Sequence, residues 1–123
     1  MKKYPGSCLC GYVKFTLSGK PSDPHLCYCQ ICQKWSGAPV VAWVNFPLSS
    51  LKYACGEPTL YRSSPKTQRG FCPKCGSTLF ALDDGSTKIC MTTAVLDDKD
   101  KITPEFESFK ESSPPWLHVP DVE

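Results

Sequence analysis

The sequence lacks long apolar runs and clusters of basic residues, and its only histidines are His25 and His118. No stretch approaches the roughly 18 apolar residues that a membrane-spanning helix needs. The basic start of the chain is not followed by an apolar segment, so no signal peptide is expected. We therefore expect a cytoplasmic protein in a reducing compartment, with no membrane partner. The lack of a Lys/Arg run weighs against nucleic-acid binding.

The composition is that of an ordinary small globular protein. The 123 residues are 41% hydrophobic and 21% charged, which argues against disorder. This length suits one hydrophobic core, so residues 1–123 are expected to form a single domain. Twelve prolines and eight glycines favour short elements joined by turns.

Nine cysteines are the exceptional feature of the composition. An odd number of cysteines in a reducing compartment points to metal ligands rather than to a disulfide framework. Metal-bound cysteines are deprotonated. Seven thiolates with two Zn²⁺ ions would change the formal charge from +2 to −1, so the small positive charge offers little support for an acidic partner.

The hydrophobic pattern mostly alternates, which predicts short β-strands. Val13, Phe15 and Leu17 alternate with Tyr12, Lys14 and Thr16. Residues 39–46 form a more apolar run, which suggests a more buried strand. Further strands are predicted at residues 51–55, 59–63, 78–82, 88–93 and 106–110. The one helical candidate follows Cys29 and runs through Gln33 and Trp35. The expected fold is mainly β, a sandwich-like arrangement of short antiparallel strands with cysteines in the loops.

The clustered cysteines form three groups: Cys8 and Cys10; then Cys27, Cys29 and Cys32; then Cys72 and Cys75. The last pair is followed by Gly76 and resembles a zinc knuckle, in which backbone N–H groups point at the sulfurs and the glycine allows a sharp turn. Spacing leaves the pairing open. Two Cys-x2-Cys pairs would make a zinc ribbon, whereas joining the first and last groups makes a four-cysteine site and leaves a three-cysteine site. Closed zinc sites are structural, and catalytic ones keep an open position.

Five segments together resemble the glutathione-dependent formaldehyde-activating enzyme family, which includes centromere-protein-V-like members. They are GSCLCGYVKF, CYCQICQKWSGAP, YRSSPKTQRGFCPKCGSTLF, AVLDD and SSPPWL, and they extend from Gly6 to Trp116. The resemblance implies a β-tent fold and two zinc ions per chain. It implies a structural zinc on Cys8, Cys10, Cys72 and Cys75, and a catalytic zinc on Cys27, Cys29 and Cys32.

The resemblance also implies a carbon–sulfur lyase that joins glutathione, or another small thiol, to formaldehyde or another small aldehyde. At an open zinc position an incoming thiol is favoured as thiolate. Lys34 and Arg69 are candidate contacts for the carboxylates of glutathione, and Ser64 is a candidate hydrogen-bonding residue. The alternative is a zinc-stabilised binding or adduct-carrier module without catalysis. The oligomeric state is not predicted.

The chain departs from the family pattern at two positions. Tyr28 stands where the family commonly has His, and Glu107 lies near a second such position. Tyr28 is expected to pack in the core, with hydrogen bonding beside the zinc as the alternative. Cys90 is expected to be a buried strand residue. Cys55 is a turn residue or a fourth ligand of the second site, and His25 is a loop residue or a ligand.

Overall fold

The computed structural model describes residues 2–120 and 122, which form two β-sheets, one α-helix and several 3₁₀ turns. The strands are β1 (Lys3–Ser7), β2 (Lys14–Ser18), β3 (Ser22–Cys27), β4 (Val41–Pro47), β5 (Lys52–Cys55), β6 (Thr59–Ser64), β7 (Thr67–Phe71), β8 (Thr78–Asp83), β9 (Lys88–Thr92) and β10 (Phe106–Ser108). The helix is α1 (Gln30–Ser36), and the 3₁₀ turns are η1 (Leu48–Ser50), η2 (Thr93–Val95), η3 (Lys99–Lys101) and η4 (Lys110–Ser112). The predicted mainly β class is confirmed.

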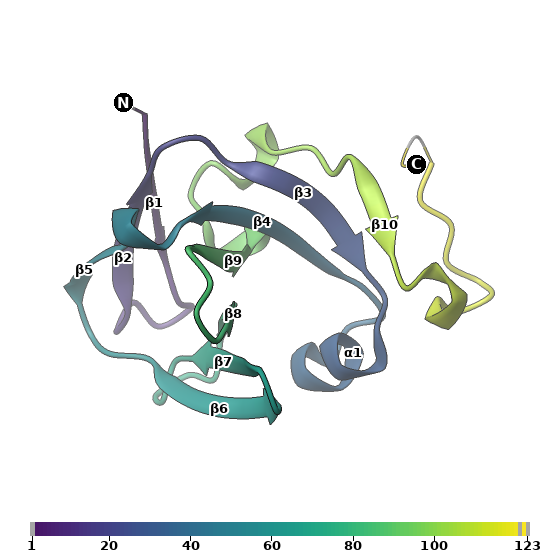
Figure 1. Cartoon of the computed structure of the whole chain (residues 1–123), viewed down its shortest axis with the longest axis horizontal. Coiled ribbons are helices and arrows are strands. Elements are labelled where there is room, and N and C mark those ends of the chain that lie inside the picture. Colours follow the sequence, from purple (N-terminus) through teal and green to yellow (C-terminus); the bar gives the residue numbers. More distant parts are fainter. Residues whose placement is uncertain (1, 121, 123) are drawn as a thin grey trace.

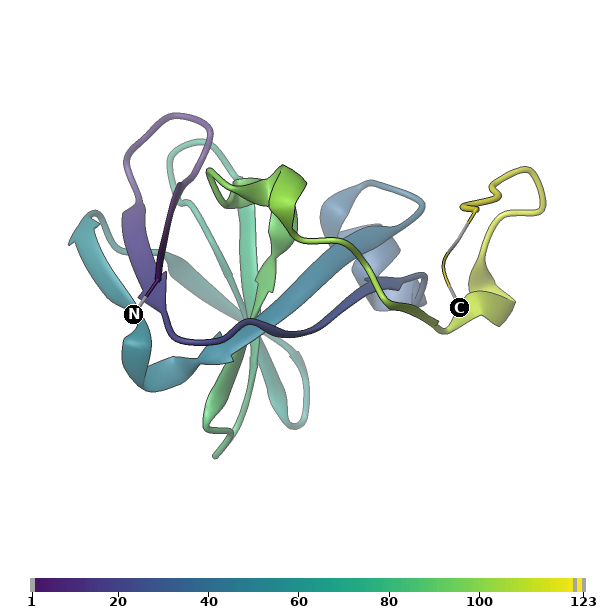
Figure 2. The same ribbon diagram turned by 90° about the horizontal axis from the view of Figure 1, so that it is seen from above.

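The smaller sheet has the order β1-β2-β5, and the larger sheet has the order β10-β3-β4-β9-β8-β7-β6. Figure 1 shows β1, β2 and β5 at one end of the molecule and α1 with β10 at the other. Seen from above, the purple start of the chain and its yellow end again lie at opposite ends (Figure 2).

The main core lies between the two sheets. Phe15 and Leu17 of β2 are buried on one face of their strand, as the alternation predicted, and they join a cluster that includes Val44 and Phe46 of β4. The rings of Tyr4 and Phe46 pack at 5.1 Å between centroids. A second, smaller cluster contains Trp43, Cys27 and Cys32, with Trp35 packed against it. Cys8 and Cys72 belong to the main cluster, whereas Cys27 and Cys32 belong to the smaller one.

The strands that the sequence did not predict are β1, β3 and β7. β1 and β3 contain proline, which interrupts a strand pattern but is tolerated at a sheet edge or an irregularity. Pro5 lies in β1, an edge strand, and β3 pairs with β4 through a register shift between Ser22 and His25. β7 is mostly polar, and it is held between β6 and β8. Pairing with neighbours, rather than local pattern, produces these three strands.

Two details of the expected strand arrangement are wrong. The last strand ends at Ser108 instead of residue 110, because Phe109 adopts a left-handed backbone with φ 56° and ψ 40°. It also pairs with β3 in parallel, whereas the other strand pairs of the described residues are antiparallel. The cysteines are likewise not all in loops, since Cys27 closes β3 and Cys32 lies within α1.

Candidate metal centres

The first cysteine group, which we define as Cys8, Cys10, Cys72 and Cys75, brings four sulfurs within 4.8 Å of one another. The Cys8 and Cys10 sulfurs lie 3.7 Å apart, and those of Cys10 and Cys72 lie 3.8 Å apart. Zn–S bonds of about 2.3 Å in a tetrahedron place two sulfurs about 3.8 Å apart. The donor set and its spacing therefore fit a tetrahedral four-thiolate zinc site.

Backbone N–H groups surround the sulfurs of this first group. The N–H groups of Lys74 and Cys75 donate to Cys72 Sγ at 3.3 and 3.4 Å, and Val13 N–H donates to Cys8 Sγ at 3.3 Å. Gly76 has a φ of +79°, so the knuckle predicted from the sequence has the expected backbone. These donors stabilise negative charge on the sulfurs, as a thiolate site requires.

The first group also connects the two sheets. Cys8 and Cys10 lie in the turn between β1 and β2, and Cys72 and Cys75 lie in the turn between β7 and β8. An ion held by all four sulfurs would join these turns across a sequence separation of more than 60 residues. The cluster is thus suited to a structural role.

The second cysteine group, which we define as Cys27, Cys29 and Cys32, comes from one short segment. Its three sulfurs also lie within 4.8 Å of one another, and those of Cys27 and Cys32 are 3.5 Å apart. Cys29 caps the start of α1, because its sulfur accepts the Cys32 N–H at 3.2 Å. The cap fixes the orientation of the short helix and so brings Cys32 back toward Cys27.

Arg69 on β7 lies against this second group. Its Nη2 donates to Cys32 Sγ at 3.6 Å, and its Nε donates to Ser63 Oγ at 3.1 Å. Its guanidinium carbon lies 4.9 Å from the Trp35 ring centroid and 5.6 Å from that of Trp43. Arg69 is 7% exposed, and among the described side chains its Nη1 is the buried polar atom without a hydrogen-bond partner. A buried, unpaired N–H group is costly, so Nη1 is a donor that a molecule bound beside the second group could satisfy.

The environment favours thiolate at Cys32. Its pKa is lowered to about 5, mainly by the hydrogen bond with the Cys27 sulfur, with Cys29 and the Arg69 guanidinium acting in the same direction. The pKa of Cys27 is raised, chiefly by the same hydrogen bond and by burial. Cys90, which lines the same cavity, has its pKa raised to about 12 by burial and by its proximity to Cys32. Negative charge is therefore concentrated next to Arg69.

The second group opens onto a cavity of about 460 Å³, which we call the cysteine cavity. All three cysteines of the second group line this cavity, together with Arg69. The remaining lining residues are His25, Trp43, Asn45, Thr67, Ala81, Asp83, Ser86, Lys88, Cys90 and Phe109. The cavity is large enough for a small organic molecule, and its walls carry cationic, anionic and aromatic groups.

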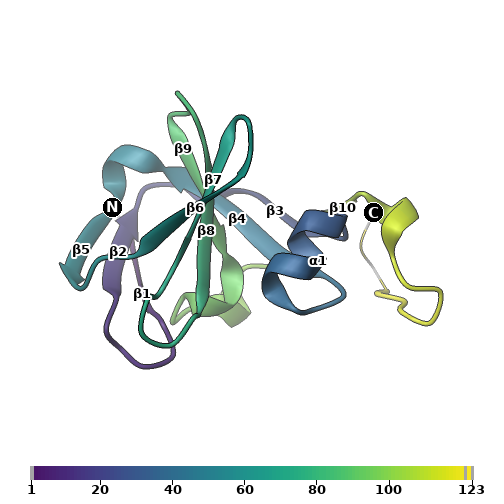
Figure 3. The ribbon, with the colours of Figure 1, turned by 90° about the horizontal axis from the view of Figure 1, so that it is seen from below.

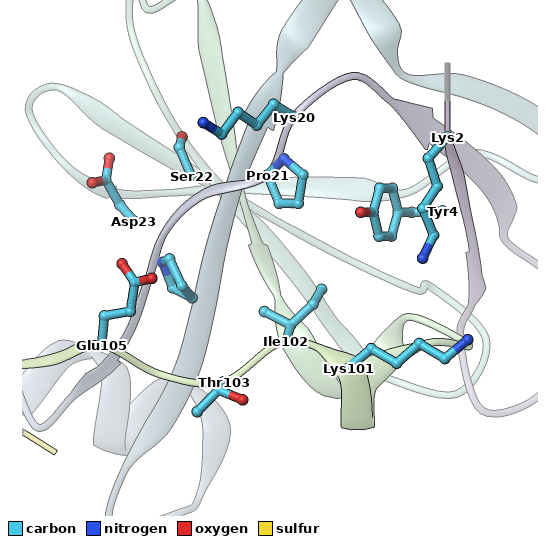
Figure 4. A pocket seen from close by; sticks show the side chains of 11 residues that line it. Lys2, Tyr4, Lys20, Pro21, Ser22, Asp23, Lys101, Ile102, Thr103 and Glu105 are labelled. Carbon is cyan, nitrogen blue, oxygen red and sulfur yellow. The ribbon is translucent and has the colours of Figure 1, made fainter. Parts of the chain in front are cut away.

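A larger cavity of about 580 Å³ lies elsewhere, between the start of β1, the start of β3 and the segment around η3. Figure 4 shows Lys2 and Lys101 at one end of it and Asp23 and Glu105 at the other. No cysteine lines this cavity. It contains none of the sulfur ligands that a thiolate zinc site needs, so the cysteine cavity is the better candidate for zinc–thiol chemistry.

The other residues singled out in the sequence lie in varied places. Lys34 is exposed on the last turn of α1 and is not among the residues that line the cysteine cavity. Ser64 is half-buried at the end of β6, and its neighbour Ser63 is the serine that accepts from Arg69. Both stay predictions as substrate contacts. Cys55 is exposed and approaches the Tyr12 carbonyl at 3.4 Å, and it lies outside the second group.

His25 and Cys90 both border the cysteine cavity without joining either group. His25 lies in β3 rather than in a loop, and its ring stacks on Phe106 at 4.8 Å. Cys90 lies in β9, as expected, but it is only partly buried where it packs against the second hydrophobic cluster. The three-cysteine group is therefore not completed by a fourth cysteine or by histidine within the described residues.

The two departures from the family pattern turn out to be partners. Tyr28 is 1% exposed and donates its hydroxyl proton to Glu107 Oε1 at 2.7 Å. Lys110 Nζ lies 2.7 Å from Glu107 Oε2. Burial and the Glu107 carboxylate raise the pKa of Tyr28 to about 12. Sequence reasoning treated the two residues separately, since nothing in a single sequence indicates a contact across 79 positions.

Comparison with known proteins finds a matching family model and several similar proteins. The family model described as glutathione-dependent formaldehyde-activating enzyme matches residues 3–112. The chain belongs to this family. A protein from Schizosaccharomyces pombe, named an uncharacterized lyase, is 30% identical over 82 residues, which are 65% of this chain and 58% of that protein. The chain thus aligns with little more than half of the yeast relative.

Two further similarities extend over more of the chain. A Halomonas elongata protein, provisionally named a glutathione-dependent formaldehyde-activating enzyme, is 26% identical over 125 aligned positions, covering 93% of this chain and 79% of the relative. A crystal structure of a Rhodobacter sphaeroides protein matches with a TM-score of 0.62 and 25% identity, covering 84% of this chain and 97% of that one. Within the described residues no helix combines the length and apolarity needed to cross a bilayer.

Proposed function

We propose that this family member is a zinc-dependent carbon–sulfur lyase that joins a small thiol to formaldehyde. The family description names glutathione, so glutathione is the thiol we propose. One observation supports this proposal above all. The three-sulfur group and the buried Arg69, whose Nη1 makes no hydrogen bond, line the same cavity. Four-sulfur and three-sulfur groups in one chain match closed structural and open catalytic zinc sites. We propose one zinc ion at each.

A zinc ion held by Cys27, Cys29 and Cys32 would supply a Lewis acid that favours the thiolate form of a bound thiol substrate. The reaction is an addition in which the thiol sulfur bonds to the carbonyl carbon while the thiol proton ends on the carbonyl oxygen. Every atom of both reactants is retained in the product. The reverse reaction breaks the same C–S bond and releases the aldehyde.

Arg69 is the residue proposed to serve the carbonyl oxygen. Its Nη2 and Nε are occupied by Cys32 and Ser63, and the two tryptophans confine its guanidinium plane. Nη1 makes no hydrogen bond, so it can donate to an oxygen that gains negative charge as the C–S bond forms. A pre-oriented donor of this kind lowers the barrier because it needs no reorganisation during the reaction.

The far wall of the cysteine cavity suits a thiol that carries charges of both signs. Lys88 is a cation for a carboxylate, and Asp83 is an anion for an ammonium group. Thr67 Oγ1 donates to Asp83 Oδ1 at 2.6 Å, which holds that carboxylate in place. On this basis we propose Lys88 and Asp83 as substrate contacts, in addition to Arg69, which the sequence already made a candidate.

The test is metal content combined with the rate of adduct exchange. Purified protein should carry two zinc ions per chain, and it should accelerate exchange between glutathione and its formaldehyde adduct, measured by NMR exchange spectroscopy against the spontaneous rate. Cys29→Ser should leave a folded protein that has lost the second ion and the acceleration. Cys55→Ser makes the same chemical change outside both groups and should match wild type.

Two results would contradict the proposal in different ways. Adduct binding without any acceleration would exclude the enzyme and support a carrier that uses the same cavity. Full acceleration by a Cys29→Ser variant would remove the three cysteines from the reaction.

A further inference from the structure

We propose that Phe109 is a specificity-determining residue of the cysteine cavity, where its ring contacts the organic body of the thiol substrate. The inference rests on the proposed function and adds a residue to it. Phe109 lines the cavity together with all three cysteines of the second group. It lies between β10 and η4, in the part of the chain that passes beside α1 (Figure 3).

Phe109 has two features that are unusual for a phenylalanine. Its φ of 56° and ψ of 40° are left-handed, and only one other non-glycine residue of the described chain, Asp23, has positive φ. Aspartate tolerates that conformation, whereas a bulky aromatic residue in it is an outlier. Its side chain is also 57% exposed. Strained residues persist where the surrounding structure holds them, and they concentrate at ligand sites.

The neighbours of Phe109 are fastened to the segment that carries the second cysteine group. On one side, Tyr28 N–H donates to the Ser108 carbonyl at 3.0 Å, and the Tyr28 hydroxyl binds Glu107. On the other side, Gln33 Nε2 donates to the Ser112 carbonyl at 3.1 Å. The same amide also donates to the Tyr28 carbonyl at 2.6 Å.

These contacts come from residues interleaved with the metal-site cysteines. Tyr28 lies between Cys27 and Cys29, and Gln33 directly follows Cys32. The position of the Phe109 ring is therefore tied to the position of the three sulfurs. Lys110 closes the arrangement through its ion pair with Glu107 at 2.7 Å. Nothing in this network requires an aromatic ring at position 109, since Phe109 takes part only through its backbone carbonyl, which accepts the Ser112 N–H at 3.0 Å.

A thiol bound at the three sulfurs would project its remaining atoms into the cavity that Phe109 borders. An aromatic wall gains free energy in proportion to the apolar area that the substrate covers. A long thiol such as glutathione covers more of the ring than a two-carbon thiol does. Phe109 therefore discriminates among thiols by size rather than by the sulfur that all of them share.

The experiment compares glutathione with 2-mercaptoethanol on the zinc-loaded protein. In Phe109→Asn the ring is removed while the new residue tolerates a left-handed backbone. We expect its dissociation constant for glutathione to rise roughly tenfold, with less than about a twofold change for 2-mercaptoethanol and an unchanged zinc content. Phe109→Tyr should restore wild-type affinity for glutathione. Trp116→Ala removes an aromatic ring that is 70% exposed and outside the cavity lining, and it should match wild type.

Each alternative outcome has a distinct meaning. If Phe109→Asn binds glutathione as tightly as wild type does, the inference is overturned and the proposed function stands. Equal weakening for both thiols, or loss of zinc, would make Phe109 a structural residue and also overturn it. If the wild-type protein binds neither thiol, the proposed function fails together with this inference.

Discussion

Replacing Cys72 with serine is expected to unfold the protein, because Cys72 belongs to the group that joins the two sheets. Cys72 is fully buried in the main core, and its sulfur accepts two backbone N–H groups. The substitution removes one of four sulfurs and leaves the β1–β2 turn without its link to the β7–β8 turn. A serine hydroxyl is a poor substitute for a thiolate ligand of zinc.

The size of the effect follows from the value of a structural zinc site. Such sites contribute about 10–16 kcal/mol in zinc-finger peptides, whereas whole domains are stable by only about 5–15 kcal/mol. Losing one ligand of four, and with it about a quarter of that binding free energy, costs roughly 3 kcal/mol. For a chain of this length, such a loss lowers the melting temperature by roughly 10 °C or more. Complete loss of the ion would exceed the stability of the fold.

The assay is thermal unfolding followed by circular dichroism, with zinc content measured on the same samples. Cys55→Ser is the matched control, since Cys55 is exposed and outside both groups. We expect Cys72→Ser to be aggregated or to melt far below wild type. Cys55→Ser should melt at the same temperature as wild type. A Cys72→Ser protein that keeps its melting temperature and both zinc equivalents would refute the assignment of Cys72 to a structural ion.

The remaining predictions concern charge near the cysteine cavity. Arg69→Lys keeps the positive charge but loses Nη1, so the rate of adduct exchange should fall by about 10²-fold with zinc retained. The control Lys52→Gln, at an exposed lysine outside the cavity lining, should change the rate far less, and equal effects would contradict the role of Nη1. The hydrogen bond with Lys110, followed by that with Tyr28, lowers the pKa of Glu107 from its ordinary 4.5. The ionised carboxylate therefore stabilises the fold above pH 4.5, and this stabilisation is lost as the pH falls through the lower pKa of the folded state. The difference in melting temperature between wild type and Glu107→Gln should therefore be largest near neutral pH and shrink below about pH 4.5; a difference that does not vary with pH would exclude this explanation.

Much of the fold could be predicted because burial follows the two-residue period in several strands. β2 buries Phe15 and Leu17 as the alternation indicates, and β4 is the more buried strand that its apolar run indicates. β3 and β7 could not be predicted, because proline, glycine and polar residues hide them and only their neighbours make them strands. The short α1 could be predicted from its place after Cys29, where a cysteine sulfur caps its first turn.

The site could be predicted less completely, for a related reason. Spacing left two ways of pairing the Cys-x2-Cys motifs, since the choice depends on which turns the sheets bring together. Arg69 was a candidate because it precedes Cys72 in the sequence, yet its side chain lies at Cys32 of the other group. The contact between Tyr28 and Glu107 depends on the parallel pairing of β10 with β3. Such contacts are set by topology, which a single sequence does not display.

The origins of the two cysteine groups explain why they should respond differently to mutation. The first group draws its sulfurs from two turns that belong to different sheets, so an ion there closes a long loop and stabilises the fold. The second group draws all three of its sulfurs from residues 27–32, which β3, β4 and α1 already hold in place. An ion there adds little to the connection of distant segments, and it borders a cavity. We therefore expect Cys29→Ser to cost activity and metal with little loss of stability, in contrast to Cys72→Ser. If the two variants proved equally unstable, both ions would be structural, and the cavity beside the second group would need another explanation.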